Sequence, residues 1–188
     1  MGLDMYLIRK KYVGAKYDWR KVTGKVEIEI DGKKLPIEFN RIEYITEDAC
    51  YWRKANAIHK WFVDNVQDGN DDCGTYWVSR VQLQELLDKC KQVKEKAIIK
   101  KGKIKNGQKL ENGKWVDIME DGEYIENADE INDILPTTDG FFFGSTDYDE
   151  YYIQDIDYTI ERLEQILKEE KELDELKLSS EFEYHSSW

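Results

Sequence analysis

The sequence is poor in the residues that hold small secreted or metal-binding proteins together. Only three of its 188 residues are cysteines, at Cys50, Cys73 and Cys90, and no two of them form a CxxC pair. An odd number of scattered cysteines argues against a disulfide framework and against a zinc site. We therefore expect neither a disulfide cross-link nor a bound metal.

Long apolar runs are also missing. No segment approaches the roughly 18 consecutive apolar residues that span a bilayer. The opening residues MGLDMYLIRKKYV carry charges where a secretory signal needs an apolar stretch. These absences predict a soluble, cytoplasmic protein that has no membrane partner.

Histidine is scarce, and no complete catalytic motif is present. His59 and His185 are the two histidines, and a histidine base needs a nucleophile and an orienting acid, which no single motif here supplies. The acidic turn at 67–74 has the alternating acids of a calcium loop but lacks the glycine and the glutamate of that loop. We expect no cofactor and no metal, and a binding protein in preference to an enzyme.

Aromatic and charged residues, by contrast, are plentiful. Hydrophobic residues make up 40% of the chain and charged residues 36%, with 6 Trp, 12 Tyr and 6 Phe. Disordered chains are poor in aromatic residues, so this composition predicts a folded protein. Because neither an internal repeat nor a Pro- or Ser-rich linker divides the sequence, residues 1–188 are expected to form a single domain.

The net charge of −12 is unevenly distributed. Residues 121–188 hold 21 acids and 4 bases, whereas residues 1–120 hold 19 acids and 24 bases. The ordinary interpretation is that the two parts lie close together and neutralise each other; the alternative is an acidic face that meets a basic partner. Direct nucleic-acid binding is not expected, because the lysines at 89–114 have no interleaved arginine and a single neighbouring aromatic residue, Trp115.

Patterns of period two predict an α+β fold with a mostly antiparallel sheet. Residues 3–13 and the final EFEYHSSW alternate as strands, and residues 25–39 form a β-hairpin. Segment 97–126 contains three turn signals and is expected to be a β-meander insertion. The turn signals are Asn106-Gly107, Asn112-Gly113 and Asp121-Gly122.

About three main helices are expected from apolar residues at helical spacing. The first covers 47–66. The second begins at a capping box formed by Ser79 and Gln82 and covers roughly 80–96. The last long helix begins near Asp147 or Asp149.

The segment YWRKANAIHKWF (51–62) is the first candidate binding surface. On the helical wheel Trp61 lies outside the apolar arc and beside cations, where an indole can stack on a base while a cation holds a phosphate. Packing of Trp61 beneath a neighbouring loop is an equal alternative. His59 lies inside the arc, which favours a buried imidazole over a functional one. The candidate ligand-binding residues of this segment are Arg53, Asn56, His59, Lys60 and Trp61.

The segment GFFFGSTDYDEYY (140–152) is the second candidate. Three consecutive phenylalanines between glycines predict a strand buried on both faces. Hydroxyl and acidic side chains then crowd the start of the last helix, where free backbone N–H groups bind anions. The alternative is that Thr146 or Asp147 only caps the helix. The candidate ligand-binding residues here are Ser145, Thr146, Asp147 and Tyr148.

The opening MGLDMYL, the segment WRKANAIHKWF, the YWVS strand and the GFFFGSTDYDE block together resemble a family of small uncharacterised phage- and prophage-encoded proteins. The resemblance covers most of the chain outside 97–126. It implies an accessory protein in the cytoplasm of a bacterial host cell, of the kind that blunts host defence. Such proteins sequester a signalling nucleotide or inhibit a defence protein, and the resemblance supplies no catalytic residues.

The leading hypothesis is therefore a phage-type protein that binds a small anionic, nucleotide-like ligand without catalysis. In this hypothesis Arg53 and Lys60 neutralise a phosphate and Trp61 stacks on the base. Ser145 and Thr146 donate hydrogen bonds from the start of the last helix.

Two alternatives remain. The protein can be an acidic inhibitor of a host defence protein that imitates nucleic-acid charge through Glu150, Asp157 and Glu161 on the last helix. It can also be an unrecognised hydrolase that uses His59 with Asp147.

Overall fold

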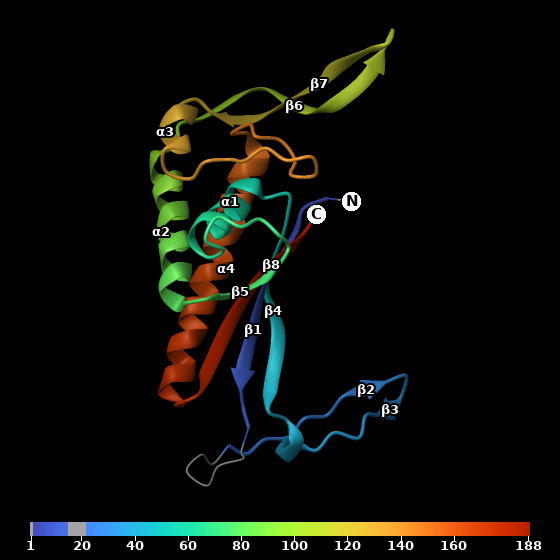
Figure 1. Cartoon of the computed structure of the whole chain (residues 1–188), viewed down its shortest axis with the longest axis vertical. Coiled ribbons are helices and arrows are strands. Elements are labelled where there is room, and N and C mark those ends of the chain that lie inside the picture. Colours follow the sequence, from blue (N-terminus) through green and yellow to red (C-terminus); the bar gives the residue numbers. More distant parts are fainter. Residues whose placement is uncertain (1, 15–21) are drawn as a thin grey trace.

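The computed structural model describes residues 2–14 and 22–188. An antiparallel sheet at its centre consists of β1 (Asp4–Tyr12), β4 (Tyr44–Arg53), β5 (Thr75–Val78) and β8 (Ser179–Ser187). The strand order is β4-β1-β8-β5, so the first and last strands of the chain pair in the middle of the sheet (Figure 1). This arrangement confirms the predicted α+β class and the predicted strands at both ends of the sequence.

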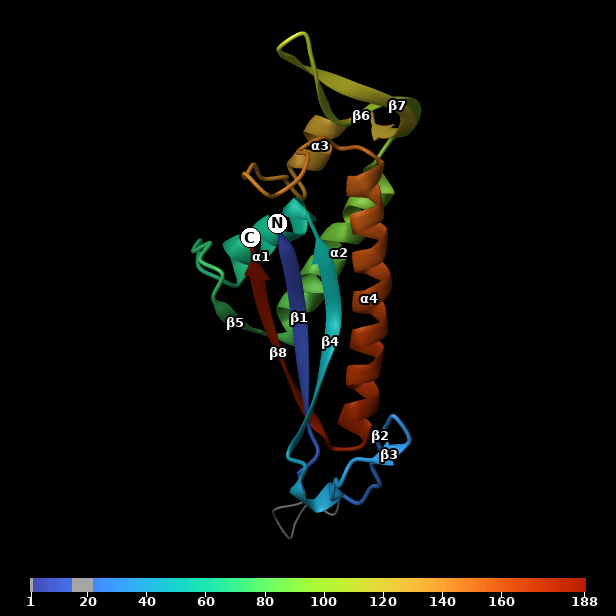
Figure 2. The ribbon, with the colours of Figure 1, turned by 90° about the vertical axis from the view of Figure 1, so that its right-hand side faces the viewer.

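Helices cover one face of the sheet (Figure 2). They are α1 (Asn56–Asn65), α2 (Arg80–Lys96) and α4 (Glu150–Glu175), whereas the short α3 (Ala128–Asn132) lies beyond the end of the sheet. The first turn of α2 is closed by the predicted capping box between Ser79 and Gln82. The apolar sides of the three longer helices meet the inward residues of β1 and β8 in one core. No helix in the described part of the chain is long and apolar enough to cross a membrane.

The predicted helix over 47–66 is wrong in its first half. Residues 44–53 form β4, which pairs with β1 from Tyr12↔Tyr44 to Asp4↔Arg53. A helical wheel and a strand both place Trp52 on an inward face, so the aromatic residues satisfied either pattern. Hydrogen bonding to the neighbouring strand β1 decides in favour of a strand. In the structure Trp52 is buried, and its indole Nε1 donates to the Thr159 hydroxyl of α4 at 2.9 Å.

Two hairpins project from opposite ends of the molecule (Figure 1). The predicted hairpin at 25–39 is present but short, with β2 (Glu29–Ile30) and β3 (Lys33–Lys34). At the other end, β6 (Ile99–Glu111) and β7 (Lys114–Ile125) form one long ribbon where a meander was expected. Only one of the three turn signals reverses the chain there; another forms a bulge in β6 between Lys105 and Gln108.

Lysines of α2 and of the long ribbon are paired with acids from the second part of the sequence. On α2, Lys91 lies 2.6 Å from Glu164 and Lys94 lies 2.7 Å from Asp157 of α4. The ordinary interpretation of the uneven charge, mutual neutralisation, is therefore confirmed for this part of the chain. Further pairs are Lys96 with Glu130, Lys100 with Glu126 and Lys103 with Asp121.

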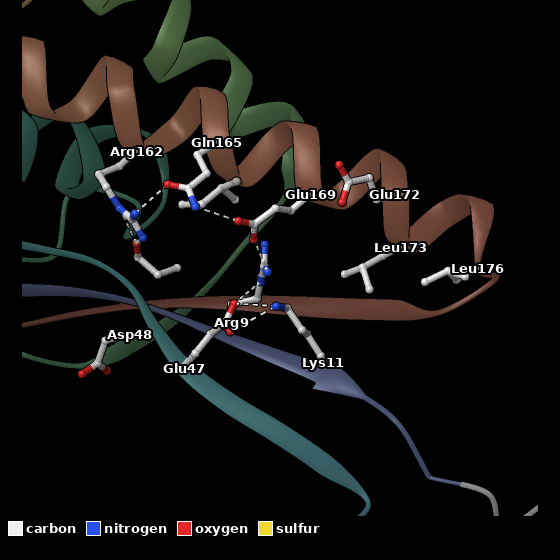
Figure 3. Close-up of a pocket in the computed structure, with 12 residues that line it drawn as sticks. Arg9, Lys11, Glu47, Asp48, Arg162, Gln165, Glu169, Glu172, Leu173 and Leu176 are labelled. Atoms are coloured by element: carbon white, nitrogen blue, oxygen red, sulfur yellow. Dashed lines mark hydrogen bonds and ion pairs between the residues drawn. The ribbon is translucent and has the colours of Figure 1, made fainter. Parts of the chain in front are cut away.

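A buried arginine ties the sheet to α4 at the far end of the helix. Figure 3 shows Arg9 of β1 between Glu47 of β4 and Glu169 of α4, at 2.7 and 2.6 Å. A third carboxylate, Glu170, lies 3.5 Å away and is itself held by Arg80 at 2.6 Å. A hollow of about 500 Å³ adjoins this network, but its central cation already has carboxylate partners. We therefore assign Arg9 a structural role.

Replacing Arg9 with methionine keeps most of the side-chain volume but removes the charge. Glu170 keeps Arg80 as a partner, so the loss comes from the contacts of Arg9 with Glu47 and Glu169 and should lower the free energy of unfolding by about 1.5–3 kcal/mol. Lys10→Met is the matched control on the same strand, since the half-exposed pair of Lys10 with Glu183 should contribute at most about 1 kcal/mol. Urea unfolding of both variants tests the assignment, and equal losses would contradict it.

Candidate functional site

A cleft of about 880 Å³ lies where β4 ends and α4 begins. Its walls come from four segments far apart in the sequence: 53–58, 105–108 in β6, 137–147, and 149–156 at the start of α4. The volume falls within the range of small-molecule sites, roughly 300–1,000 Å³. Parts of both predicted binding segments therefore line one cavity.

Lys54 is a cation of this cleft that the sequence did not single out. Its backbone has a φ of 62°, in the left-handed region that non-glycine residues rarely adopt. Two hydrogen bonds hold this turn: its N–H donates to the Leu3 carbonyl and its carbonyl accepts from the Asn56 N–H, both at 2.8 Å. Within the described residues Lys54 has no ion-pair partner, so its charge remains available in the cleft.

The neighbouring Arg53 also lines the cleft, but as the last residue of β4 and not as part of a helix. Its side chain is 63% exposed, and its guanidinium lies 4.0 Å from the Asp4 carboxylate. An exposed ion pair at this distance is weak. Arg53 can therefore turn toward an anion at little cost in stability.

Asn56 holds in place the loop at 137–147, which forms another wall of the cleft. Its amide nitrogen donates to the carbonyl oxygens of Phe143 and Ser145, at 3.1 and 2.6 Å, and its oxygen accepts from the Thr138 N–H. The side chain is buried, and both ends of its amide are used by the loop at 137–147. Asn56 therefore holds the loop against α1, and we reassign it from ligand binding to positioning.

The predicted strand through the three phenylalanines is wrong. These residues form an irregular turn in which Phe141 is 92% exposed and Phe143 is buried. A strand needs a partner for its backbone, and in the structure Gly140 and Phe143 hydrogen-bond to each other across the turn. The next residue, Gly144, packs against Lys54: a Cβ added to Gly144 would lie 3.2 Å from the Lys54 Cβ.

Ser145, Thr146 and Asp147 line the cleft and are exposed. The Ser145 hydroxyl accepts from the Asp147 N–H at 3.1 Å, and the Thr146 carbonyl accepts from the Thr137 hydroxyl. None of the three caps α4, so the predicted capping role of Thr146 or Asp147 is wrong.

The N-cap is Asp149, which was predicted only as a possible first residue of the helix. One of its carboxylate oxygens accepts from the N–H groups of Tyr151 and Tyr152, at 2.9 and 3.3 Å. The other oxygen, Oδ2, is buried and has no hydrogen-bond donor among the residues that the structure describes. Removal from water raises the pKa of Asp149, although the two backbone donors oppose the shift.

Asp155 is a second carboxylate in the cleft, from the second turn of α4. Burial raises its pKa to about 7, and the negative charge of Asp149 adds to the increase. The sequence contains a signal for it, because Asp155 stands beside the apolar stripe of α4 and not opposite it. A carboxyl group that titrates near neutrality in a cleft is typical of a functional site.

His59 lies outside the cleft and is completely buried. Its Nδ1 is 2.7 Å from the Tyr184 hydroxyl, and its Nε2 is 3.1 Å from the Asp71 carboxylate, in poor hydrogen-bond geometry. These partners, from β8 and the acidic turn, agree with the favoured interpretation of a core histidine. Asp147 is not among its polar contacts, so the geometry gives the His59–Asp147 hydrolase no support.

Three further predicted residues do not line the cleft. Trp61 is only 7% exposed and packs edge-on against Phe62, so the predicted stacking surface is wrong and the alternative of a packed indole agrees with the structure. The predicted helix is longer than α1, which has ten residues and is buried around most of its circumference. Lys60 pairs with Asp64 at 2.9 Å, and the Tyr148 hydroxyl donates to Asn132.

Comparison with protein-family models, with curated proteins and with solved structures found no match for this chain. What the cleft can bind is therefore inferred from its own residues. The predicted ligand-binding residues that remain candidates are Arg53, Ser145, Thr146 and Asp147. The candidates that the structure adds are Lys54, Asp149, Tyr151 and Asp155.

The raised pKa of Asp155 predicts a pH-dependent penalty on stability. The folded pKa of about 7 lies above the unfolded value of roughly 3.9. Ionisation therefore destabilises the folded state increasingly from about pH 4 to pH 7, and fully above pH 7. Asp155→Asn removes this charge and should raise the melting temperature at pH 8, with the gain disappearing toward pH 4.

We expect a gain at pH 8 of at least about 1 kcal/mol after allowance for partial exposure, or roughly 2–4 °C. Asp157→Asn is the matched control on the same helix, because the Asp157 carboxylate is exposed and pairs with Lys94. Calorimetric melting at pH 4, 6 and 8 measures both variants. A gain for Asp155→Asn that is the same at all three values would exclude the raised pKa.

Proposed function

We propose that the cleft binds a small anionic, nucleotide-like molecule without changing it chemically. The observation that carries this proposal is Lys54, a cation with no ion-pair partner in the described chain, held in a strained turn on the cleft wall. Backbone strain of this kind costs about 1–3 kcal/mol and is found preferentially at functional sites. The turn brings the Lys54 side chain against Gly144, in the loop that carries Ser145 and Thr146.

In this proposal the phosphate of the ligand lies between two sets of groups. Arg53 and Lys54 supply positive charge from the end of β4, and the hydroxyls of Ser145 and Thr146 supply donors from the facing loop. Tyr151, which is 44% exposed and lines the cleft, takes the stacking role first given to Trp61. Stacking of a base on an aromatic ring contributes about 1–3 kcal/mol.

The biological role that we propose follows from the sequence resemblance. A phage-type accessory protein with a nucleotide site can blunt host defence by sequestering a signalling nucleotide in the bacterial cytoplasm. Such a role needs binding and no turnover.

The charge-mimicry alternative receives less support. Of the three acids proposed to meet a basic partner, Asp157 is paired with Lys94 of α2, and Glu150 accepts a hydrogen bond from the Glu123 N–H of β7. Carboxylates that already have partners within the chain imitate a nucleic-acid backbone poorly. We therefore keep the cleft as the primary site.

The proposal is tested by removing the two cations. Arg53→Ala and Lys54→Met should each weaken the binding of adenosine 5′-monophosphate or of a cyclic dinucleotide at least tenfold, or about 1.4 kcal/mol, because each removes a charge-assisted contact. A thermal-shift screen identifies the ligand first, since a nucleotide at 100 times its Kd adds about 2.7 kcal/mol of stability. Titration calorimetry then measures the affinities.

Lys60→Ala is the control, since Lys60 lies on the helix that follows, α1, but does not line the cleft. Its affinity should equal that of the wild type. Binding that falls equally in all three variants would point to general electrostatics and not to this site. Binding that is unchanged by Arg53→Ala and Lys54→Met would remove the cleft from consideration.

A further inference from the structure

The second wall of the cleft carries a buried carboxylate oxygen with no hydrogen-bond donor. Asp149 is 3% exposed, its Oδ1 caps α4, and its Oδ2 has no donor among the described residues. A buried acceptor without a partner is rare in folded proteins and destabilises them by about 1–3 kcal/mol. A donor on a bound molecule would satisfy this oxygen, because Asp149 lines the cleft.

Asp155 lines the same cleft from the same helix, close enough to Asp149 for their charges to interact. Asp155 follows Asp149 by six residues, or about 9 Å along the axis of α4, so Asp149 alone offers an unpartnered oxygen to a donor. A metal ion is a poor fit, because no group of three or more His, Cys, Asp or Glu side chains suited to a metal occurs within residues 2–14 and 22–188. A neutral hydroxyl supplies the one donor that this oxygen lacks and introduces no further charge.

We propose that Asp149 Oδ2 accepts a hydrogen bond from a hydroxyl of a ribose, so that the cleft selects ribose phosphates over their deoxy counterparts. Carboxylates of aspartate are well suited to the hydroxyls of a ribose. This inference rests on the proposed function and extends it: the phosphate lies against Arg53 and Lys54 on one wall, and the sugar hydroxyls meet α4 on the other.

Asp149→Asn separates this role from helix capping. Asparagine caps helices about as well as aspartate, so its oxygen can keep the bonds to the N–H groups of Tyr151 and Tyr152. The amide nitrogen then takes the place of Oδ2 and presents a donor where a hydroxyl donor would bind. Asp139→Asn is the control, since Asp139 lines the same cleft from the loop and is exposed.

Titration calorimetry with four probes tests the inference: adenosine 5′-monophosphate, 2′,3′-dideoxyadenosine 5′-monophosphate, ribose 5-phosphate and adenosine. The wild type should bind the dideoxy nucleotide at least tenfold more weakly than the ribonucleotide. Asp149→Asn should abolish this difference while unfolding normally, and Asp139→Asn should retain it. Comparable affinity for ribose 5-phosphate would assign the selectivity to a free sugar phosphate as well as to a nucleotide.

The outcomes distinguish this inference from the proposed function. Equal binding of the ribo and dideoxy nucleotides by the wild type, or a difference that survives in Asp149→Asn, overturns the ribose contact and leaves the anion site in place. Binding of adenosine that depends on Asp149, with no gain from a phosphate, overturns the anion site and supports the ribose contact. Absence of binding for all four probes overturns both.

Discussion

The chain changes from strand to helix at a single left-handed residue, and the sheet, the cleft and the loop beside it all depend on that turn. Lys54 donates to the Leu3 carbonyl, which extends the pairing of β4 with β1, and accepts from the N–H of Asn56, which starts α1. From that position Asn56 fixes the loop at 137–147. The close approach of Gly144 to Lys54 then forms one side of the cleft.

Two charged regions of the molecule differ in whether their charged groups have oppositely charged neighbours. Arg9 has three carboxylates within 3.5 Å, and the most buried of them, Glu170, has a second arginine. Within the described chain, the cleft instead contains a cation without an ion-pair partner, Lys54. It also contains a buried carboxylate, Asp149, of which one oxygen has hydrogen-bond donors and the other has none. Opposite charges in contact hold the sheet to α4, whereas unpaired groups that line a cavity are suited to a ligand.

Local patterns identified the elements whose hydrogen bonds are local. The capping box of α2 and the turn of the short hairpin depend on residues within a few positions of one another, so the sequence was enough to place them. The patterns failed where the partner is distant. Residues 44–53 became a strand because β1 is available to pair with them, and the three phenylalanines formed a turn held by Asn56 from another part of the chain.

The sequence by itself determined the fold class, the strands at both ends of the sheet, the long last helix and two of the segments that line the cleft. The tertiary structure decided which residues of those segments face the cavity, and it added Lys54, Asp149 and Asp155. The physical reason is that availability to a ligand depends on burial and on hydrogen-bond partners, which come from elements distant in the sequence. Trp61 and His59 carry suitable chemistry but are buried in the core, whereas Lys54, unremarkable in the sequence, lies at the cleft because a turn holds it there.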